Sequence, residues 1–193
     1  MAVLISPSGS WILRRGRCLA GALVLLLLVW AAGGQPGNVE YRIKAAYLFN
    51  FAKFVSWPST VFPSPDAPIV IGILGNDPFG SEIDETIADK AIEGRPLRVK
   101  RLGDTNSWEG CHILFITSSE RKTLPQILQK LGTSPILTVA EMEEFTDIGG
   151  MIRFFPYENN IRFAIDLGPV DAAGLKISSK LLQVAVVKGI ARK

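Results

Sequence analysis

Histidine and cysteine are scarce in this chain of 193 residues, which has one histidine and two cysteines. A single imidazole excludes a metal or catalytic site that needs several histidines. The sequence also lacks the G-x-S-x-G, CxxC and HExxH motifs. Cys111 and His112 are neighbours in a predicted strand, where adjacent side chains point to opposite faces, so they cannot form a catalytic pair. We therefore predict no enzyme activity, no cofactor and no metal site.

An excess of basic charge is also missing once the first residues are set aside. Lys and Arg number 21 against 18 Asp and Glu, but Arg14, Arg15 and Arg17 are the only charged residues before Glu40. The remainder therefore carries 18 charges of each sign, which excludes a basic domain that binds nucleic acid. With 48% hydrophobic and 20% charged residues, the sequence predicts a packed domain of about 160 residues.

The start of the chain has the pattern of an export signal. An uncharged apolar run from Leu19 to Trp30 follows the three arginines, and the small residues Ala31 to Gly34 come next. We predict a secretory signal peptide at residues 1–33, cleaved near Gly33. The apolar run is shorter than the roughly 20 residues that span a bilayer comfortably, and a retained anchor is the alternative.

Removal of that segment leaves Cys111 as the last remaining cysteine. A disulfide within the mature chain is then impossible, and Cys111 is either a small buried hydrophobic residue or pairs between chains. Export without an internal disulfide is typical of the bacterial periplasm, so we predict that compartment.

Periodicity and turn residues predict alternating helices and strands after residue 38. The predicted helices cover 39–57 (ended by Pro58), 81–91, 123–131 (opened by a Thr123 capping box) and 178 or 179 to 188. The predicted strands cover 69–74, 97–102, 112–117 and 136–139, with a hairpin at 151–155 and 161–167, and a helical turn at 171–174. This order predicts an α/β fold: a single domain over 38–190, with a mixed β-sheet flanked by helices and a C-terminal β-hairpin and helix.

The hairpin offers the best candidate for a binding site. If Pro156 lies opposite Ile161, Arg153 and Arg162 project from one face together with Asp166. Two neighbouring guanidinium groups repel each other unless they share an anion or a carboxylate. Either Asp166 or Glu158 pairs with them, or the face binds an anion or small ligand.

Lys53 is the fourth candidate ligand-binding residue. It lies on one predicted helix stripe with Trp57, where its stem either packs on aromatic rings or its ammonium contacts a ligand. We assign structural roles to a further set of residues that suit core, turn or capping positions: Trp57, Gly149, Gly150, Gly174 and Ser178.

Several segments together resemble a known family. The chain from Lys44 to Pro58, KAAYLFNFAKFVSWP, is similar to the opening signature of the YfiR family of periplasmic proteins. Further similar segments follow in the same order, at 71–75, 111–116, 137–139, 149–152 and 174–182. The similarity extends from about Val39 to Val187.

The resemblance implies a regulator that is not an enzyme. The best-known member holds a membrane-bound diguanylate cyclase inactive by binding its periplasmic part, which limits cyclic-di-GMP and biofilm formation. It also implies an α/β domain that forms homodimers, and a partner that is such a cyclase or a membrane sensor protein. The chain departs from the family where Phe163-Ala-Ile-Asp166 replaces the frequent Phe-Glu-Ile-Asn, and it lacks the disulfides of well-studied members.

Two hypotheses follow from these observations. In the first, the protein represses a membrane diguanylate cyclase by direct contact and responds to a small-molecule signal. In the second, it is a periplasmic binding protein for a small anionic or aromatic ligand and has no cyclase partner. A third, an exported hydrolase, lacks a nucleophile with an adjacent base.

Overall fold

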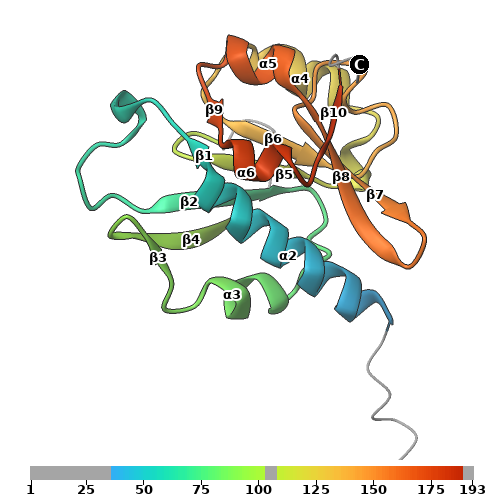
Figure 1. The fold of residues 1–193 in the computed structure, drawn as a ribbon, viewed down its shortest axis with the longest axis horizontal. Helices are drawn as coiled ribbons and strands as arrows, with labels where there is room; N and C mark the ends of the chain where they lie inside the picture. The colour runs from blue at the N-terminus through green and yellow to red at the C-terminus, as the bar shows by residue number, and fades with distance from the viewer. Residues whose placement is uncertain (1–35, 103–107, 189–193) are drawn as a thin grey trace, which may run out of the picture. The chain divides into compact units, whose positions relative to one another are not determined.

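Eight strands form one mixed sheet in the order β10-β8-β7-β6-β5-β2-β4-β3 (Figure 1). The computed structural model describes residues 36–102 and 108–188, so the predicted signal peptide at 1–33 lies outside the described residues. The strands are β2 (Ile69–Leu74), β3 (Ala91–Ile92), β4 (Arg95–Leu102), β5 (Ile113–Ile116), β6 (Leu137–Ala140), β7 (Ile152–Tyr157), β8 (Asn160–Asp166) and β10 (Val186–Lys188). The predicted α/β class, a mixed sheet flanked by helices, is confirmed.

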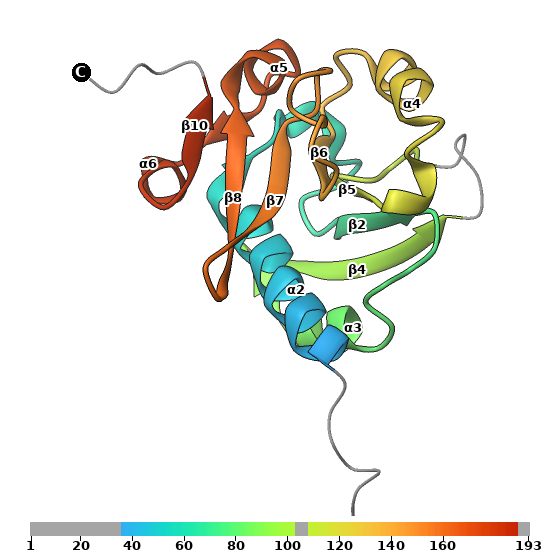
Figure 2. The ribbon, with the colours of Figure 1, turned by 90° about the vertical axis from the view of Figure 1, so that its right-hand side faces the viewer.

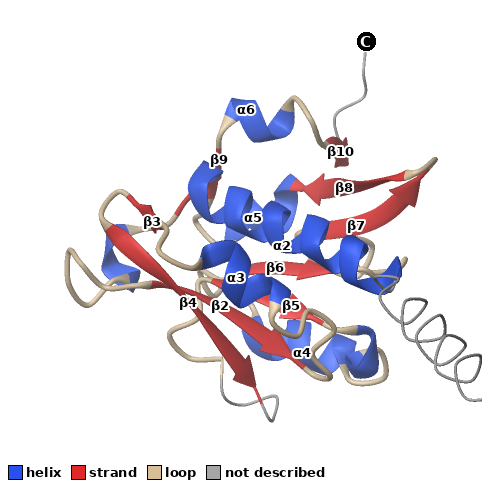
Figure 3. Cartoon of the chain, turned by 90° about the horizontal axis from the view of Figure 1, so that it is seen from below, coloured by secondary structure: helices blue, strands red, loops and turns tan. Residues whose placement is uncertain are grey.

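Helices cover both faces of this sheet (Figures 2 and 3). They are α2 (Pro36–Phe54), α3 (Glu82–Ile87), α4 (Leu124–Leu131), α5 (Leu167–Ala172) and α6 (Ser179–Leu182), with 3-10 turns η2 (Ser59–Val61) and η3 (Ser118–Glu120). Side chains of α2 and α3 share one buried cluster with Ile71, Ile73 and Phe115. Those of α4 share a second cluster with Leu74 and Ile116. Alternate residues of the central strands therefore belong to two separate hydrophobic cores, one on each face of the sheet.

Parallel pairing explains why the central strands read as continuous apolar runs. β5 lies between β2 and β6, and β2 lies between β4 and β5. The pairs β2–β4, β2–β5 and β5–β6 are all parallel. Every residue of β5 and β6 is buried. Strands covered on both faces have no solvent side for polar residues, so the alternation of a half-exposed strand is missing.

The hairpin has the register on which its two expected faces depend. Pro156 lies opposite Ile161, and Phe154 lies opposite Phe163, with Glu158 at the turn. The inner face is buried against α2, where the Phe51 ring is 5.7 Å from that of Phe154 and 5.1 Å from that of Phe163. Aromatic contacts of this kind fix α2 across the hairpin.

The first predicted helix extends too far, because α2 ends at Phe54 and not at Trp57. Val55 and Ser56 form β1 (Val55–Ser56), which pairs antiparallel with β9 (Lys176–Ile177) in a separate two-stranded sheet. The pairing partner lies more than 100 residues away, so the local sequence does not reveal it.

The prediction of a last helix that reaches Lys188 is also wrong. α6 stops at Leu182, and β10 then pairs in parallel with Ala164 to Asp166 of β8 at one edge of the sheet. The predicted turn at 171–174 is the end of a longer helix, α5, that begins at Leu167. Ser178 precedes α6, and its hydroxyl accepts a hydrogen bond from the Lys180 amide at 3.3 Å.

Two further helix predictions need correction. The helix expected at 81–91 ends at Ile87, and Ala91 and Ile92 form β3. The Thr123 side chain does not cap α4; its hydroxyl lies 3.0 Å from the Glu120 carbonyl and 2.9 Å from a Glu120 carboxylate oxygen. The preceding turn η3 places these acceptors closer than the amides of α4.

Candidate functional site

The outer face of the hairpin carries two arginines above two aromatic rings. Arg153 lies opposite Ala164, and Arg162 lies opposite Phe155, so both guanidinium groups are on the face away from α2. The Arg153 guanidinium carbon is 5.2 Å from the Phe155 ring centre. The Arg162 guanidinium carbon is 4.2 Å from the Tyr157 ring centre. We call Arg153, Phe155, Tyr157 and Arg162 the hairpin face.

Nearby carboxylates are engaged by a different cation. Lys188 Nζ is 2.8 Å from Asp147 Oδ1 and 3.5 Å from Asp166 Oδ2. The other oxygen of Asp166 accepts from the Gly168 amide at the start of α5, at 3.0 Å. Among the described residues neither arginine forms an ion pair, and Arg153 Nε is buried without a hydrogen-bond partner. The arginines therefore keep positive charge that an outside carboxylate or phosphate would neutralise.

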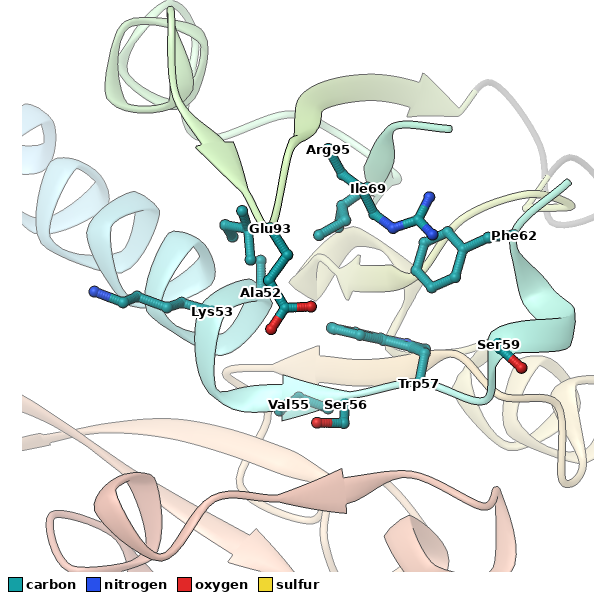
Figure 4. A pocket seen from close by; sticks show the side chains of 11 residues that line it. Ala52, Lys53, Val55, Ser56, Trp57, Ser59, Phe62, Ile69, Glu93 and Arg95 are labelled. Carbon is teal, nitrogen blue, oxygen red and sulfur yellow. The ribbon is translucent and has the colours of Figure 1, made fainter. Parts of the chain in front are cut away.

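Lys53 does not lie on the hairpin face. It lies in the last turn of α2, which packs on the opposite side of the hairpin, and it lines a pocket of about 240 Å³ (Figure 4). The structure thus places three predicted ligand residues, Arg153, Arg162 and Asp166, on one surface and the fourth in another. In Figure 4 the Lys53 ammonium points away from this pocket.

The pocket is assembled from three parts of the chain that are distant in sequence. The segment from Ala52 to Phe62 supplies Trp57, β2 supplies Ile69, and the β3–β4 turn supplies Glu93 and Arg95. Figure 4 shows the Glu93 carboxylate directed beside the Trp57 ring. We call this space the Trp57 pocket; it combines an indole ring, a carboxylate and a guanidinium group.

Arg95 and Phe62 form one wall of the Trp57 pocket, and the buried His112 ring stacks on Phe62 behind that wall. The Arg95 guanidinium carbon is 3.9 Å from the Phe62 ring centre, and Phe62 stacks on His112 at 4.5 Å and 15°. Arg95 Nη1 also donates to the carbonyls of Ser64 and Ala67, at 2.8 and 3.0 Å. The guanidinium group is therefore held in place before any ligand arrives.

His112 is a buried and uncharged member of this stack. Its Nδ1 accepts from the Val70 amide at 3.1 Å, and its carbonyl accepts from Trp57 Nε1 at 3.1 Å. Burial, and next the positive charge of Arg95, lower the pKa of His112 to about 4. Its Nε2 is buried without a hydrogen-bond partner among the described residues. The histidine supports the wall of the pocket as a neutral ring.

Cys111 occupies the other core, next to α4. It is buried among the cluster that contains Leu74 and Leu114, and burial raises the pKa of its thiol. Cys111 and His112 therefore pack on different sides of the sheet, as the strand alternation predicts. A protonated thiol away from the imidazole is a poor nucleophile.

A buried lysine lies where α2 packs on the sheet. The Lys44 side chain is 3% exposed and forms ion pairs with Glu40 and Glu141, the latter at 2.9 Å. Burial, and next the charge of Glu141, raise the pKa of Tyr41 to about 12. The sequence shows the Glu40–Lys44 spacing but not Glu141, which follows β6 and meets α2 through the fold alone.

Within residues 36–102 and 108–188, no three His, Cys, Asp or Glu side chains are grouped as metal ligands would be. In the same residues no helix combines the length and hydrophobicity that a bilayer crossing requires.

The fold is that of a mixed α/β domain, with the hairpin face and the Trp57 pocket at its surface. Residues 41–186 match the YfiR/HmsC-like family, and the chain belongs to that family. This confirms the family that the sequence motifs indicate. The family is one of periplasmic regulators associated with diguanylate cyclase signalling.

A solved structure supports the fold. The chain is similar to a conserved domain protein from Vibrio cholerae O1 biovar eltor str. N16961, with a TM-score of 0.50 and 10% sequence identity. The similarity covers 74% of this chain and 59% of the Vibrio chain. No curated protein matches the chain.

Proposed function

We propose that this protein is a periplasmic repressor of an inner-membrane diguanylate cyclase. It binds the periplasmic part of the cyclase directly and limits cyclic-di-GMP and biofilm formation. The observation that carries this proposal is the match to the YfiR/HmsC-like family over residues 41–186, almost the whole described domain. The homodimer implied by the family is part of the proposal.

The hairpin face is the proposed contact surface. Neither of its two arginines forms an ion pair within the part of the chain that the structure describes, and Tyr157 is 45% exposed beside them. Arginine and aromatic side chains are the residue types that contribute most to protein interfaces. A partner segment with carboxylates and apolar groups would neutralise the charge and cover the rings.

Repression then works by population shift. The bound regulator favours the inactive arrangement of the cyclase, and its release frees the enzyme. A small-molecule signal would act only if it binds the free and the complexed regulator with different affinities. The Trp57 pocket, with Glu93 and Arg95 at its rim, is the proposed site for that signal.

The first experiment deletes the gene and measures cyclic-di-GMP in a strain that normally expresses it. We expect the level to rise. An unchanged level would reject the repressor function, whichever surface is involved.

The second experiment tests the contact surface by complementation. Arg162→Glu combined with Arg153→Glu should fail to restore repression, because both charges now repel acidic groups on the partner. Lys122→Glu together with Lys176→Glu is the matched control, since both lysines are exposed and lie outside the hairpin face. Full repression by the hairpin double variant, at equal protein level, would reject this surface but leave the repressor function standing.

A second candidate function is a periplasmic binding protein for a small ligand, without a cyclase partner. The Trp57 pocket favours it, since the pocket combines an aromatic ring with a carboxylate and a guanidinium group. Ligand-induced thermal stabilisation that Trp57→Ala abolishes, in a strain whose cyclic-di-GMP does not respond to gene deletion, would favour this function over the first.

A further inference from the structure

Strand β4 has a long unpaired side. It pairs in parallel with β2 from Leu97 to Leu102, but on its other side β3 covers only Arg95 and Pro96. No other described strand pairs with β4 on that side. Six consecutive residues, 97–102, therefore form an edge of the sheet, and edge strands offer their amides and carbonyls to an added strand.

The turn that precedes β4 shows which groups point outward. Ile92 and Arg95 flank a two-residue turn in which Glu93 and Gly94 have φ of +50° and +81°. In such a hairpin the flanking residues exchange hydrogen bonds, so the Arg95 amide and carbonyl point toward β3. Because backbone groups alternate in direction along a strand, those of Leu97, Val99 and Arg101 also point away from β2.

A groove lies beside this edge. The groove has a volume of about 560 Å³. It lies between residues 88–91, which precede and begin β3, and the first half of β4. Its floor includes Ile87 and Leu97, which are 6% and 8% exposed, and half-buried Val99. An extended segment that enters the groove would meet outward backbone groups and an apolar floor at once.

The charge of β4 restricts what can pair there. The strand contains Arg95, Arg98, Lys100 and Arg101 and no acidic residue. Arg101 is neutralised by Asp77 and Asp84, at 2.6 and 2.5 Å. Arg98 is exposed and has no ion-pair partner among the described residues. A second copy of β4 would place cations against cations, which destabilises a strand pair. The groove is also lined by Asp84, which pairs with Arg101, and by Asp89 and Lys90, which carry opposite formal charges. Arg98 is therefore the cation of this lining that an acidic strand would pair with.

We propose that the β4 edge binds an extended acidic segment of a partner protein as an additional strand. Main-chain hydrogen bonds to Leu97, Val99 and Arg101 hold the segment, and Arg98 selects its acidic residues. This β4 edge site is separate from the hairpin face, and it stands whether or not the protein represses a cyclase.

The test uses the domain without its signal peptide and a synthetic peptide of alternating glutamate and valine, with a lysine–valine peptide of equal length as its counterpart. Amide hydrogen exchange measured by NMR should slow at Leu97, Val99 and Arg101 with the acidic peptide only. A version of the acidic peptide methylated on alternate backbone nitrogens should not bind, since it cannot form the strand pair.

Variants then separate charge from main-chain pairing. Arg98→Glu should lower the affinity of the domain for the acidic peptide about fivefold, as expected for loss of one cross-strand charge pair. Lys122→Glu, at an exposed lysine outside both the β4 edge and the hairpin face, is the control and should leave binding unchanged. Val99→Pro removes one outward amide at an edge position that tolerates proline, and should weaken binding further.

Three results would overturn the proposal. One is unchanged exchange at Leu97, Val99 and Arg101 with saturating acidic peptide. Another is equal binding of the lysine–valine peptide. A third is self-association of the domain that Val99→Pro abolishes, which would assign the edge to a second copy of the chain. None of these results bears on cyclic-di-GMP, so they leave the proposed function untouched.

Discussion

Two groups of aromatic side chains in this domain differ in what surrounds them. The first, between α2 and the inner face of the hairpin, joins Tyr47, Phe51, Phe154 and Phe163, and its ring contacts involve no charged group. The second joins Trp57, Phe62 and His112, with Arg95 stacked on the outside. We call them the hairpin cluster and the Trp57 cluster.

The two clusters also differ in how far they are buried. Phe51, Phe154 and Phe163 are at most 1% exposed, so their stacking removes apolar surface from water. Trp57 and Phe62 are half-buried and line a pocket, and their polar neighbours are held by backbone carbonyls and amides. The hairpin cluster holds the elements together, and the Trp57 cluster lines the pocket in which we propose that a ligand binds.

The largest expected effect comes from the hairpin cluster. Phe154→Ala should lower the free energy of unfolding by about 3–5 kcal/mol, because it leaves a cavity beside Phe51 and Phe115. Urea denaturation measures this change. Phe155→Ala, one residue along the chain but on the outer face, is the control and should cost about 1 kcal/mol. Equal losses for both variants would contradict the division between the two faces.

The next effect concerns pH and the Trp57 cluster. His112 has a folded-state pKa of about 4, below the ordinary value of 6.5, so the unfolded chain binds more protons between these values. Stability should therefore rise with pH across this window and fall on acidification from pH 6.5 toward 4, by up to about 3 kcal/mol. Because His112 is the only histidine, its NMR titration reads this pKa directly.

The control for the pH prediction is His112→Asn, which keeps an acceptor for the Val70 amide but does not titrate. Carboxylates such as Asp66 and Asp147, whose pKa values lie below the ordinary range, contribute their own acid dependence in both proteins. Only the difference between the stability–pH curves of the two proteins gives the contribution of His112 titration. A measured His112 pKa near 6.5 would contradict its description as a buried neutral ring.

A smaller effect is expected at the indole nitrogen. Trp57→Phe removes the hydrogen bond to the His112 carbonyl and should lower stability by about 1–2 kcal/mol. Thermal denaturation at neutral pH measures the loss. An unchanged stability, with the rest of the pocket intact, would show that this contact is replaced by water.

The smallest effect is expected for Arg95→Lys. Lysine keeps the charge but loses the planar stack on Phe62 and the fixed bonds to Ser64 and Ala67 carbonyls, which should cost about 1 kcal/mol or less. Arg98→Lys is the control on the same strand and should cost nothing measurable. The informative readout is the His112 pKa, which the looser lysine charge should allow to rise slightly.

Local patterns in the sequence predict much of the fold. The alternation in 151–167 predicts the hairpin, and with Pro156 placed opposite Ile161 it also predicts both of its faces, because a strand period of two is a local property. The apolar runs at β2 and β5 are recognisable for the same reason. The predictions are wrong where the structure of a segment depends on a strand that is distant in the sequence. Val55 pairs with Ile177, and Val186 pairs with Ala164.

The candidate sites divide in the same way. Arg153 and Arg162 share a face because they belong to one hairpin, and the sequence brings them together. The Trp57 pocket escapes sequence analysis, because Phe62, Glu93 and Arg95 come from a connector and a turn that meet only in the folded domain. Nothing in the local pattern around Glu93-Gly94 marks it as the rim of a pocket.

The long-range packing of α2 has a consequence for how the domain forms. The Tyr47 hydroxyl donates to the Ile161 carbonyl, 114 residues later in the chain, and the rings beside it contact the same hairpin. A high contact order of this kind slows folding, because the connecting chain must be ordered before the contact is gained. A nascent polypeptide that ends before Ile152 therefore exposes an apolar helix without its docking surface, and such a fragment is a natural substrate for chaperones and proteases.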